Sequence, residues 1–301
     1  SVGVPGVLRA LKQAHEQHGK LPWHDLFAPA IALARNGFAV SERLHTLLAG
    51  DPYIARSPAM ARYFLDEQGR PLAVGTILRN PELAHTLEQI AAQGPEVFYS
   101  GEMAEAIVAT VRGHANAGYL SLQDLQQYQA KEREPLCGPY KAWQICGMPP
   151  PSSGGVTVLQ TLGLLEAVQR TAPQRDLAAL RPLAISSPAR LEAPPLAVHL
   201  IAEAERLAYA DRAQYLADND YVPVPVKALT DSAYLASRAA LIGEHSMKRA
   251  RPGQPQGADL ALAPDRSPLR ISTSHLSAVD DSGQALAMTT SVEAAFGSHL
   301  M

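Results

Sequence analysis

The residues with the clearest chemical potential form the run Ser272-Thr273-Ser274-His275, which lies between a Pro- and Gly-rich stretch and an alternating, strand-like one. A hydroxyl residue at the very start of a strand can attack the carbonyl group before it, and this N-to-O acyl shift would cut the chain between Ser272 and Thr273. The α-amino group released on Thr273 has an ordinary pKa of about 7.7–8.0, so it can act as base for the hydroxyl of the same residue. The spacing alone also allows a plain polar entry into a strand, because Thr is common in strands.

Three other polar runs lack groups that their chemistry would need. His15-Glu16-Gln17-His18 carries two histidines without a third ligand, and a zinc site needs at least three protein ligands. Asp218-Asn219-Asp220 resembles the start of a calcium loop without its later Gly and Glu, so a turn is the better interpretation. Ser152-Ser153-Gly154-Gly155 offers hydroxyls with no base adjacent in sequence. The sequence has no G-x-S-x-G elbow, H-E-x-x-H helix or Gly-rich phosphate loop.

The composition is that of a soluble globular chain. Of 301 residues, 47% are hydrophobic and 18% charged, and 26 Lys and Arg against 29 Asp and Glu give a net charge of −3. Without an excess of positive charge, nucleic acid is disfavoured as a partner. No apolar run approaches the roughly 20 residues of a membrane helix, and no signal peptide is visible. The chain starts at Ser1 without a Met and ends just after a strand-like run, so we expect an internal piece of a longer protein.

The elements that must position these residues begin with helices. Apolar spacing and Pro, Asn and Gly boundary signals predict helices over 7–18, 22–36, 80–93 and 102–114. Ser121 and Asp124 form a capping-box pattern that predicts a further helix start. In the second half the pattern predicts helices over 155–168 and 196–217, with another beginning at Thr230 and Asp231 and ending near Gly243.

Strands are predicted in two places. Residues 137–148 read as a short strand pair with a turn at 138–141. Cys137 and Cys146 could face each other across it, although two free, semi-buried cysteines are the simpler interpretation. Residues 274–280 and 285–292 alternate around the turn Asp281-Ser282-Gly283, which predicts an antiparallel hairpin. The stretches 169–195 and 248–270 lack periodicity and are predicted to be the least ordered parts.

Several stretches, in order along nearly the whole chain, resemble the γ-glutamyltranspeptidase family of N-terminal-nucleophile hydrolases. The most specific is Met148-Pro149-Pro150-Pro151-Ser152-Ser153-Gly154-Gly155. The others are Gly3–Gly6, Leu26–Ala34 with Gly37-Phe38, Asn80–Leu83, Gly94–Gly101, Leu125–Tyr128, Glu203–Arg212, and Thr273–Ser277 with Asp280, Gly283, Phe296 and Gly297.

The resemblance implies roles for three residues. Thr273 falls on the family's nucleophile, freed by cleavage of the Ser272–Thr273 bond. Ser291 falls on a hydroxyl residue, usually Thr, that hydrogen-bonds the nucleophile, and a turn at Asp281–Gly283 would bring residues 289–291 opposite Thr273. Glu293 falls where many members have an Asn that contacts the γ-glutamyl donor. A carboxylate there would attract the donor's ammonium group but repel its carboxylate.

The fold implied is the α+β, four-layer αββα sandwich of these hydrolases, incomplete in this chain. Residues 1–272 would form a large-subunit-like region, with linker 248–272, and residues 273–301 the start of the small subunit. The family's donor-binding arginine would precede Ser1, and its oxyanion-hole glycines would follow Met301. Because loss of one oxyanion donor costs on the order of 10²–10³ in rate, we expect the 301-residue piece alone to be inactive.

The function implied for the full-length protein is γ-glutamyl transfer or hydrolysis with glutathione-type donors. Water or an amino acid would be the acceptor, and the resemblance implies neither a metal nor an organic cofactor. The partners would be the two subunits of one precursor, with no nucleic acid. Two alternatives stay open: an amidase or acylase with another acyl donor, favoured by Glu293, and a non-catalytic family member. The resemblance suggests a periplasmic or secreted protein, and the sequence itself leaves the compartment open.

Overall fold

The computed structural model describes residues 2–172, 194–258 and 273–300, and these divide into two compact units. Unit 1 combines residues 1–131 with 269–301, and unit 2 comprises residues 132–268. The division differs from the predicted subunit boundary at residue 273, since unit 1 takes its chain from both sides of it. That boundary concerns a covalent cut rather than packing, and it stays a prediction.

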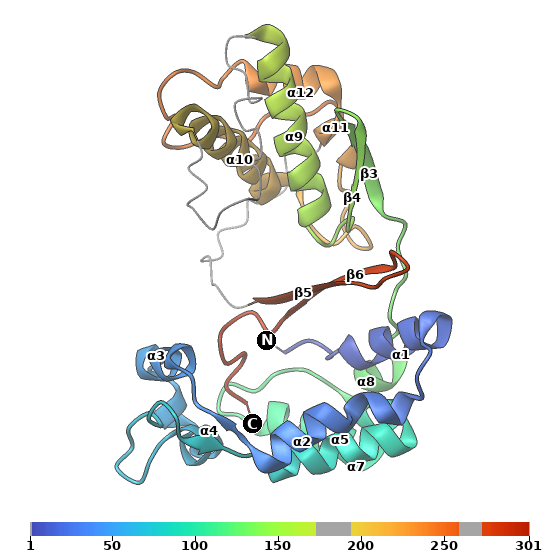
Figure 1. The fold of residues 1–301 in the computed structure, drawn as a ribbon, viewed down its shortest axis with the longest axis vertical. Coiled ribbons are helices and arrows are strands. Elements are labelled where there is room, and N and C mark those ends of the chain that lie inside the picture. The colour runs from blue at the N-terminus through green and yellow to red at the C-terminus, as the bar shows by residue number, and fades with distance from the viewer. Residues whose placement is uncertain (1, 173–193, 259–272, 301) are drawn as a thin grey trace. The chain divides into compact units, whose positions relative to one another are not determined.

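Unit 1 is mainly helical, with two short strand pairs (Figure 1). Its helices are α1 (Val7–His18), α2 (Ala28–Asn36), α3 (Glu42–Gly50), α4 (Pro58–Phe64), α5 (Pro81–Gln93), α6 (Glu96–Tyr99), α7 (Gly101–Gly113) and α8 (Leu122–Gln127), with 3-10 turns at Trp23–Phe27 and Ile54–Arg56. Strand β1 (Phe38–Ala39) pairs antiparallel with β2 (Ile77–Leu78), and β5 (Thr273–Val279) pairs antiparallel with β6 (Ala285–Ser291).

The predicted helices of unit 1 are confirmed, and their caps explain where they begin and end. The Asn80 side chain accepts a hydrogen bond from Leu83 N at 2.8 Å at the start of α5, and Pro81 follows as the first helical residue. Ser121 and Asp124 form the predicted capping box of α8. One boundary differs from the predicted helix over 22–36: residues 23–27 form a 3-10 turn, and α2 begins at Ala28.

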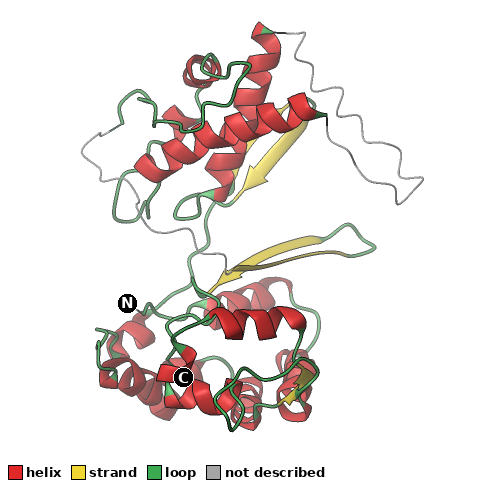
Figure 2. Cartoon of the chain, turned by 90° about the vertical axis from the view of Figure 1, so that its left-hand side faces the viewer, coloured by secondary structure: helices red, strands yellow, loops and turns green. Residues whose placement is uncertain are grey.

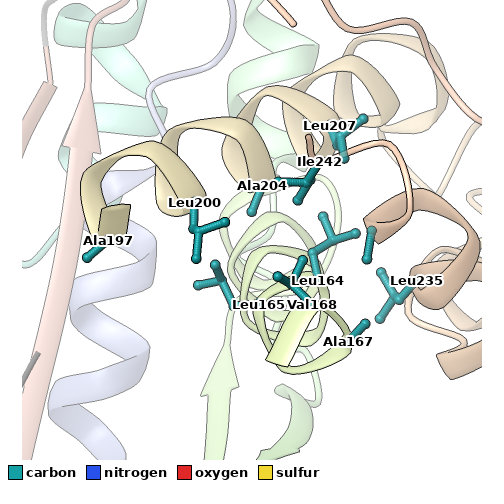
Figure 3. Packing of buried hydrophobic residues seen from close by; sticks show 11 residues of the cluster. Leu164, Leu165, Ala167, Val168, Ala197, Leu200, Ala204, Leu207, Leu235 and Ile242 are labelled. Carbon is teal, nitrogen blue, oxygen red and sulfur yellow. The ribbon is translucent and has the colours of Figure 1, made fainter. Parts of the chain in front are cut away.

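Unit 2 is organised around one long helix, α9 (Gly154–Thr171). The hairpin of β3 (Leu136–Tyr140) and β4 (Trp143–Gly147) packs on α9, as do α10 (Pro195–Tyr215) and α12 (Ser232–Ala239), with the short α11 (Val226–Leu229) beside them (Figures 1 and 2). Figure 3 shows side chains of α9 meeting those of α10 and α12. This apolar core consists of Leu164, Leu165, Ala167, Val168, Ala197, Leu200, Ala204, Leu207, Leu235, Ala239 and Ile242.

A buried carboxylate ties the elements of unit 2 together. Asp211 on α10 is 1% exposed and accepts hydrogen bonds from Gln160 Nε2 on α9, from Tyr234 OH and Arg238 Nη2 of α12, and from Gly253 N. Arg238 Nη2 lies 3.2 Å from Asp211 Oδ1, so the buried carboxylate forms an ion pair. Arg238 Nη2 also donates a hydrogen bond to the backbone oxygen of Arg251 at 2.7 Å. Together with the hydrogen bond from Gly253 N, this contact ties the described part of the predicted linker 248–270 to the core. The rest of that stretch, and nearly all of 169–195, lies outside the described residues.

The hairpin of β3 and β4 corrects two expectations. Its turn consists of Lys141 and Ala142 rather than residues 138–141, because Gly138 is a strand residue that lies close to Leu159 of α9. Cys137 and Cys146 pair directly across the strands as a disulfide, with 4.1 Å between their Cα atoms, and both are exposed. The interpretation as free, semi-buried cysteines is therefore wrong.

The predicted α+β class is confirmed, but the arrangement of the strands differs from one expectation. The sandwich implied by the resemblance would lay the helices over a mixed sheet in which residues 274–280 and 285–292 are antiparallel neighbours. Within the described ranges the strands instead form three separate two-stranded antiparallel sheets. Helix α9 packs against β3 and β4, whereas nearly every residue of β5 and β6 is exposed to solvent.

Candidate active site

The hairpin of β5 and β6 brings Thr273 and Ser291 together. Its turn is held by the Asp280 side chain, which accepts hydrogen bonds from the backbone N–H groups of Ser282 and Gln284 and from the Ser282 hydroxyl. The hydrogen bond from the Ser282 side chain is the main reason why the pKa of Asp280 lies below its ordinary value. Gly283 adopts φ 84°, a left-handed conformation that glycine tolerates at no steric cost.

This turn determines the strand register, and Thr273 lies directly opposite Ser291. Thr273 Oγ1 donates a hydrogen bond to Ser291 Oγ at 3.2 Å. Ser291 Oγ also accepts a hydrogen bond from the backbone N–H of Glu293 at 3.1 Å. The three residues singled out in the sequence are thus brought together at the open end of one hairpin.

Glu293 has an unusual backbone conformation. Its φ is 70°, in the left-handed region that side chains other than Gly, Asn and Asp seldom adopt. The hydrogen bond from its N–H to Ser291 Oγ helps to hold this conformation. An Asn, which the family resemblance places here in many members, would tolerate it better.

The hydroxyl pair opens onto a pocket of about 290 Å³. Thr273 and Ser274 come from the start of β5, Thr290 and Ser291 from the end of β6, and Val292 and Ala295 from the segment that follows. The remaining wall comes from α3, through Arg43 and Leu47. Sequence reasoning missed Arg43, and no local signal could have found it, because α3 lies some 230 residues from the hairpin.

Residues 292–300 fasten the hairpin to the helices of unit 1. Phe296 packs on the buried side chains of Leu48, Ile54 and Met60, which lie on or near α3 and α4. His299 Nε2 lies 2.8 Å from Asp51 Oδ2, just beyond the end of α3. Burial alone would raise the pKa of Asp51, but the hydrogen bond with His299 and further backbone hydrogen bonds bring it below the ordinary value.

His275 lies two residues after Thr273, on the same face of the hairpin. Its Nδ1 is 2.8 Å from Thr289 Oγ1 and its Nε2 is 3.0 Å from Ser277 Oγ. Both ring nitrogens are therefore engaged by neighbouring hydroxyls.

The two signature stretches in unit 2 meet each other. Arg212 Nε, at the end of the Glu203–Arg212 run on α10, donates a hydrogen bond to Ser153 Oγ at 2.9 Å. A second, smaller pocket of about 80 Å³ lies there, lined by Pro151, Ser153, Arg212 and Leu216. A guanidinium cannot accept the proton of a hydroxyl, so this contact does not supply Ser153 with a base.

The other polar runs also form ordinary structure. His15 lies in the last turn of α1, and its Nε2 lies 2.8 Å from the backbone oxygen of Leu21. Asp218 begins a turn, and Asp220 pairs with Arg133 through both carboxylate oxygens. In the part of the chain that the structure describes, no three His, Cys, Asp or Glu residues cluster in a way that could hold a metal ion. The described helices include none that is long and apolar enough to cross a membrane.

The whole chain, residues 1–301, matches the sequence profile of the family described as Gamma-glutamyltranspeptidase. It is 34% identical to a glutathione hydrolase proenzyme of Escherichia coli K12, a match that covers 99% of this chain and 47% of that protein. It is equally 34% identical to the acylase ACY 1 proenzyme of Pseudomonas sp. V22, over 99% of this chain and 48% of that protein. The chain thus spans about half the length of these curated relatives.

Two solved structures, one of a γ-glutamyltranspeptidase and one of a cephalosporin acylase, are similar to the structure of this chain. The γ-glutamyltranspeptidase of Helicobacter pylori aligns with a TM-score of 0.72 and 32% identity, covering 86% of this chain and 70% of that one. The cephalosporin acylase of Bacillus halodurans aligns with a TM-score of 0.75 at 24% identity, over 99% of this chain and 49% of that one, which supports the fold alone. The α+β fold of the chain is therefore that of these N-terminal-nucleophile hydrolases.

Proposed function

The chain belongs to the gamma-glutamyltranspeptidase family, and we propose that the protein carrying it transfers or hydrolyses γ-glutamyl groups with Thr273 as its nucleophile. The observation that carries the proposal is the hydrogen bond from Thr273 Oγ1 to Ser291 Oγ at the mouth of a pocket. A relative described as a glutathione hydrolase proenzyme, 34% identical, supports the substrate class.

The first step is self-processing. Thr273 Oγ1 attacks the carbonyl carbon of Ser272, the Ser272–Thr273 C–N bond breaks, and an ester replaces the amide. Water then hydrolyses this ester, which leaves a carboxylate on Ser272 and a free α-amino group on Thr273. Residues 1–272 would belong to the large subunit, and residues 273–301 to the start of the small one.

The second step is acyl transfer. The new α-amino group accepts the proton of Thr273 Oγ1 as the oxygen attacks the carbonyl carbon of the donor's γ-amide. The amine of the donor leaves with that proton, and the acyl group stays on Thr273 as an ester. Water or the amino group of an acceptor then attacks the ester and restores the hydroxyl. An intact precursor cannot do this, because the nitrogen of residue 273 is an amide that does not accept a proton at neutral pH.

A second candidate is an acylase that takes another acyl group. It is favoured by Glu293, whose carboxylate opposes the carboxylate of a γ-glutamyl donor, and by the 34% identity to acylase ACY 1 proenzyme. Turnover of γ-glutamyl, glutaryl and simple acyl anilides by the processed protein would separate the two activities.

The test uses the full-length protein and its Thr273 variants. Wild type should give two bands in a denaturing gel, with the smaller chain starting at Thr273. Thr273→Ala should abolish cleavage and turnover, and Thr273→Ser should keep part of both because the hydroxyl remains. Thr110→Ala, on the distant helix α7, is the matched control and should process normally. A small chain that starts elsewhere, or turnover by the uncut Thr273→Ala protein, would refute the proposal.

A further inference from the structure

The pocket of the hydroxyl pair has two walls that come from distant parts of the chain. Val292 and Ala295 line it from the segment that follows β6, and Arg43 and Leu47 line it from α3. The space between these walls therefore depends on whatever holds residues 292–300 against α3.

The backbone of this segment does not provide that hold. Its backbone hydrogen bonds run from Ala294 N to Val292 O, from Gly297 N to Ala294 O and from His299 N to Phe296 O, so they close tight turns within the segment. Among the described residues, no backbone hydrogen bond joins 292–300 to α3. The position of the segment must therefore depend on side chains.

Two side chains of the segment reach the end of α3. Phe296 packs on an apolar cluster that includes Leu48 of α3. His299 Nε2 lies 2.8 Å from Oδ2 of Asp51, the residue that directly follows this helix. The apolar contact can slide, whereas a hydrogen bond requires a defined distance and direction. The contact between His299 and Asp51 is therefore the one that can fix the position of the segment.

Both partners of this contact are themselves held in place. The side chains of His299 and Asp51 are only 19% and 17% exposed, and partial exclusion of water strengthens a polar contact. Asp51 Oδ1 accepts a hydrogen bond from Tyr53 N at 2.8 Å, which leaves Oδ2 for the imidazole. The ring of Tyr53 in turn lies 5.5 Å from the ring of His299. His299 has φ 60°, a region where His, Asn and Asp are enriched among side chains.

We propose that Asp51 and His299 are positioning residues, whose contact sets the width of the pocket and thereby the binding of the acyl donor beside Thr273. This inference rests on the proposed function of Thr273. Because the hairpin itself holds Thr273 against Ser291, the contact between Asp51 and His299 acts on donor binding rather than on the chemical step.

Steady-state kinetics of the processed full-length protein test the proposal. Asp51→Asn and His299→Asn should each lower kcat/KM for γ-glutamyl-4-nitroanilide by about three- to tenfold, the value of one hydrogen bond. The loss should come from a higher KM, with kcat and the extent of processing at Thr273 unchanged. Both changes preserve the local backbone, since Asn can still accept from Tyr53 N and also tolerates the left-handed conformation at residue 299.

The double variant Asp51→His/His299→Asp exchanges the two partners and should recover part of the lost kcat/KM. Asp66→Asn is the matched control, because Asp66 is another paired aspartate of unit 1, bound to Arg70, and does not line the pocket. It should leave KM unchanged, and thermal unfolding checks that every variant is folded. A wild-type KM in both Asn variants, a loss confined to kcat, or an equal rise of KM in Asp66→Asn would overturn the inference.

Hydrogen–deuterium exchange gives a readout that does not need turnover. Asp51→Asn should speed exchange of the backbone N–H groups in residues 292–300 and leave β5 and β6 unchanged. Failure of processing at Thr273, or the absence of acyl transfer, would refute the proposed function. In that case unchanged exchange in 292–300 would overturn the inference as well, whereas faster exchange would support the positioning contact.

Discussion

At the scale of single residues, the contact between Thr273 and Ser291 has a local cause. The two positions are 18 residues apart and become partners because a turn at Asp280–Gly283 pairs the strands in one register. A slip of one residue would turn Thr273 and Ser291 to opposite faces. The hydroxyl contact thus depends on the hydrogen bonds that the Asp280 side chain accepts in the turn.

Replacing Ser291 tests the role of the hydroxyl pair. In the full-length protein, Ser291→Ala should slow both processing and turnover by about five- to tenfold, the value of one neutral hydrogen bond. Ser291→Thr keeps the hydroxyl and should retain most of both rates. Single-turnover kinetics and gel analysis of processing measure these effects, and unchanged rates in Ser291→Ala would contradict the role.

Glu293→Asn should improve the handling of a γ-glutamyl donor. The change removes a charge that opposes the donor's carboxylate; two like charges at 4 Å near a protein surface repel by about 4 kcal/mol before screening. We expect kcat/KM for γ-glutamyl-4-nitroanilide to rise by about tenfold. This change corresponds to only part of the repulsion energy, because the site is exposed and its charges are screened. An unchanged or lower kcat/KM would indicate that Glu293 pairs with the donor's ammonium group.

The same substitution should change stability, because residue 293 has φ 70°. Asn tolerates the left-handed region better than Glu, so the free energy of unfolding should rise by about 0.5 kcal/mol. Urea denaturation measures the free energy of unfolding. Glu293→Gln is the control, because it removes the charge but tolerates the left-handed backbone conformation no better than Glu.

At the scale of elements, the disulfide between Cys137 and Cys146 links β3 to β4 across nine residues of sequence. The chain-entropy model assigns a loop of this length about 2.5 kcal/mol. Cys146→Ser should therefore lower the stability of unit 2 by roughly this amount in urea, and so should reduction of the wild type. If reducing agent leaves the wild-type midpoint unchanged, the two thiols are not paired in solution.

The segment after β6 should loosen in acid. The folded-state pKa of Asp51 is depressed, so this carboxylate stabilises the fold above its unfolded pKa of about 3.9 and loses that effect as pH falls through the lower, folded value. Asp51→Asn should remove this part of the acid dependence below about pH 4. Urea midpoints of both proteins from pH 3 to 6 measure the difference, and parallel profiles would show that the pair contributes nothing.

At the scale of the whole molecule, unit 1 is built from two stretches of chain that the proposed cut would separate covalently. Residues 273–300 contact residues 43–64 through the pocket, the Phe296 cluster and the Asp51–His299 pair. Cleavage before Thr273 should therefore leave both chains in one particle, and size-exclusion chromatography of the processed protein should show them eluting together.

Phe296→Ala measures how much the contact between residues 273–300 and residues 43–64 contributes to the free energy of unfolding. Phe296 is half-buried, so we expect a loss of about 2 kcal/mol, roughly half of the cost of removing a fully buried Phe. Phe38→Ala, at a residue that is 44% exposed, is the matched control and should cost less. Equal losses in the two variants would show that Phe296 does not hold the small chain to the helices.

The sequence by itself determined the features that depend on near neighbours. Helix boundaries at Asn80-Pro81 and Ser121–Asp124, the turn at Asp281–Gly283 and the nucleophile candidate Thr273 all follow from local hydrogen bonding and strand alternation. The family likewise followed from ordered runs of residues, which the match over residues 1–301 bears out.

Only the tertiary structure decided what depends on distant segments. Gly138 reads as a turn residue in sequence but lies in a strand close to Leu159, and the cysteines pair because the strand register places them opposite each other. Arg43 reaches the pocket of Thr273 because Phe296 and His299 pack the end of the hairpin against α3 and α4. Such contacts arise from burial of apolar surface between segments far apart in the chain, for which no local pattern in the sequence is a signal.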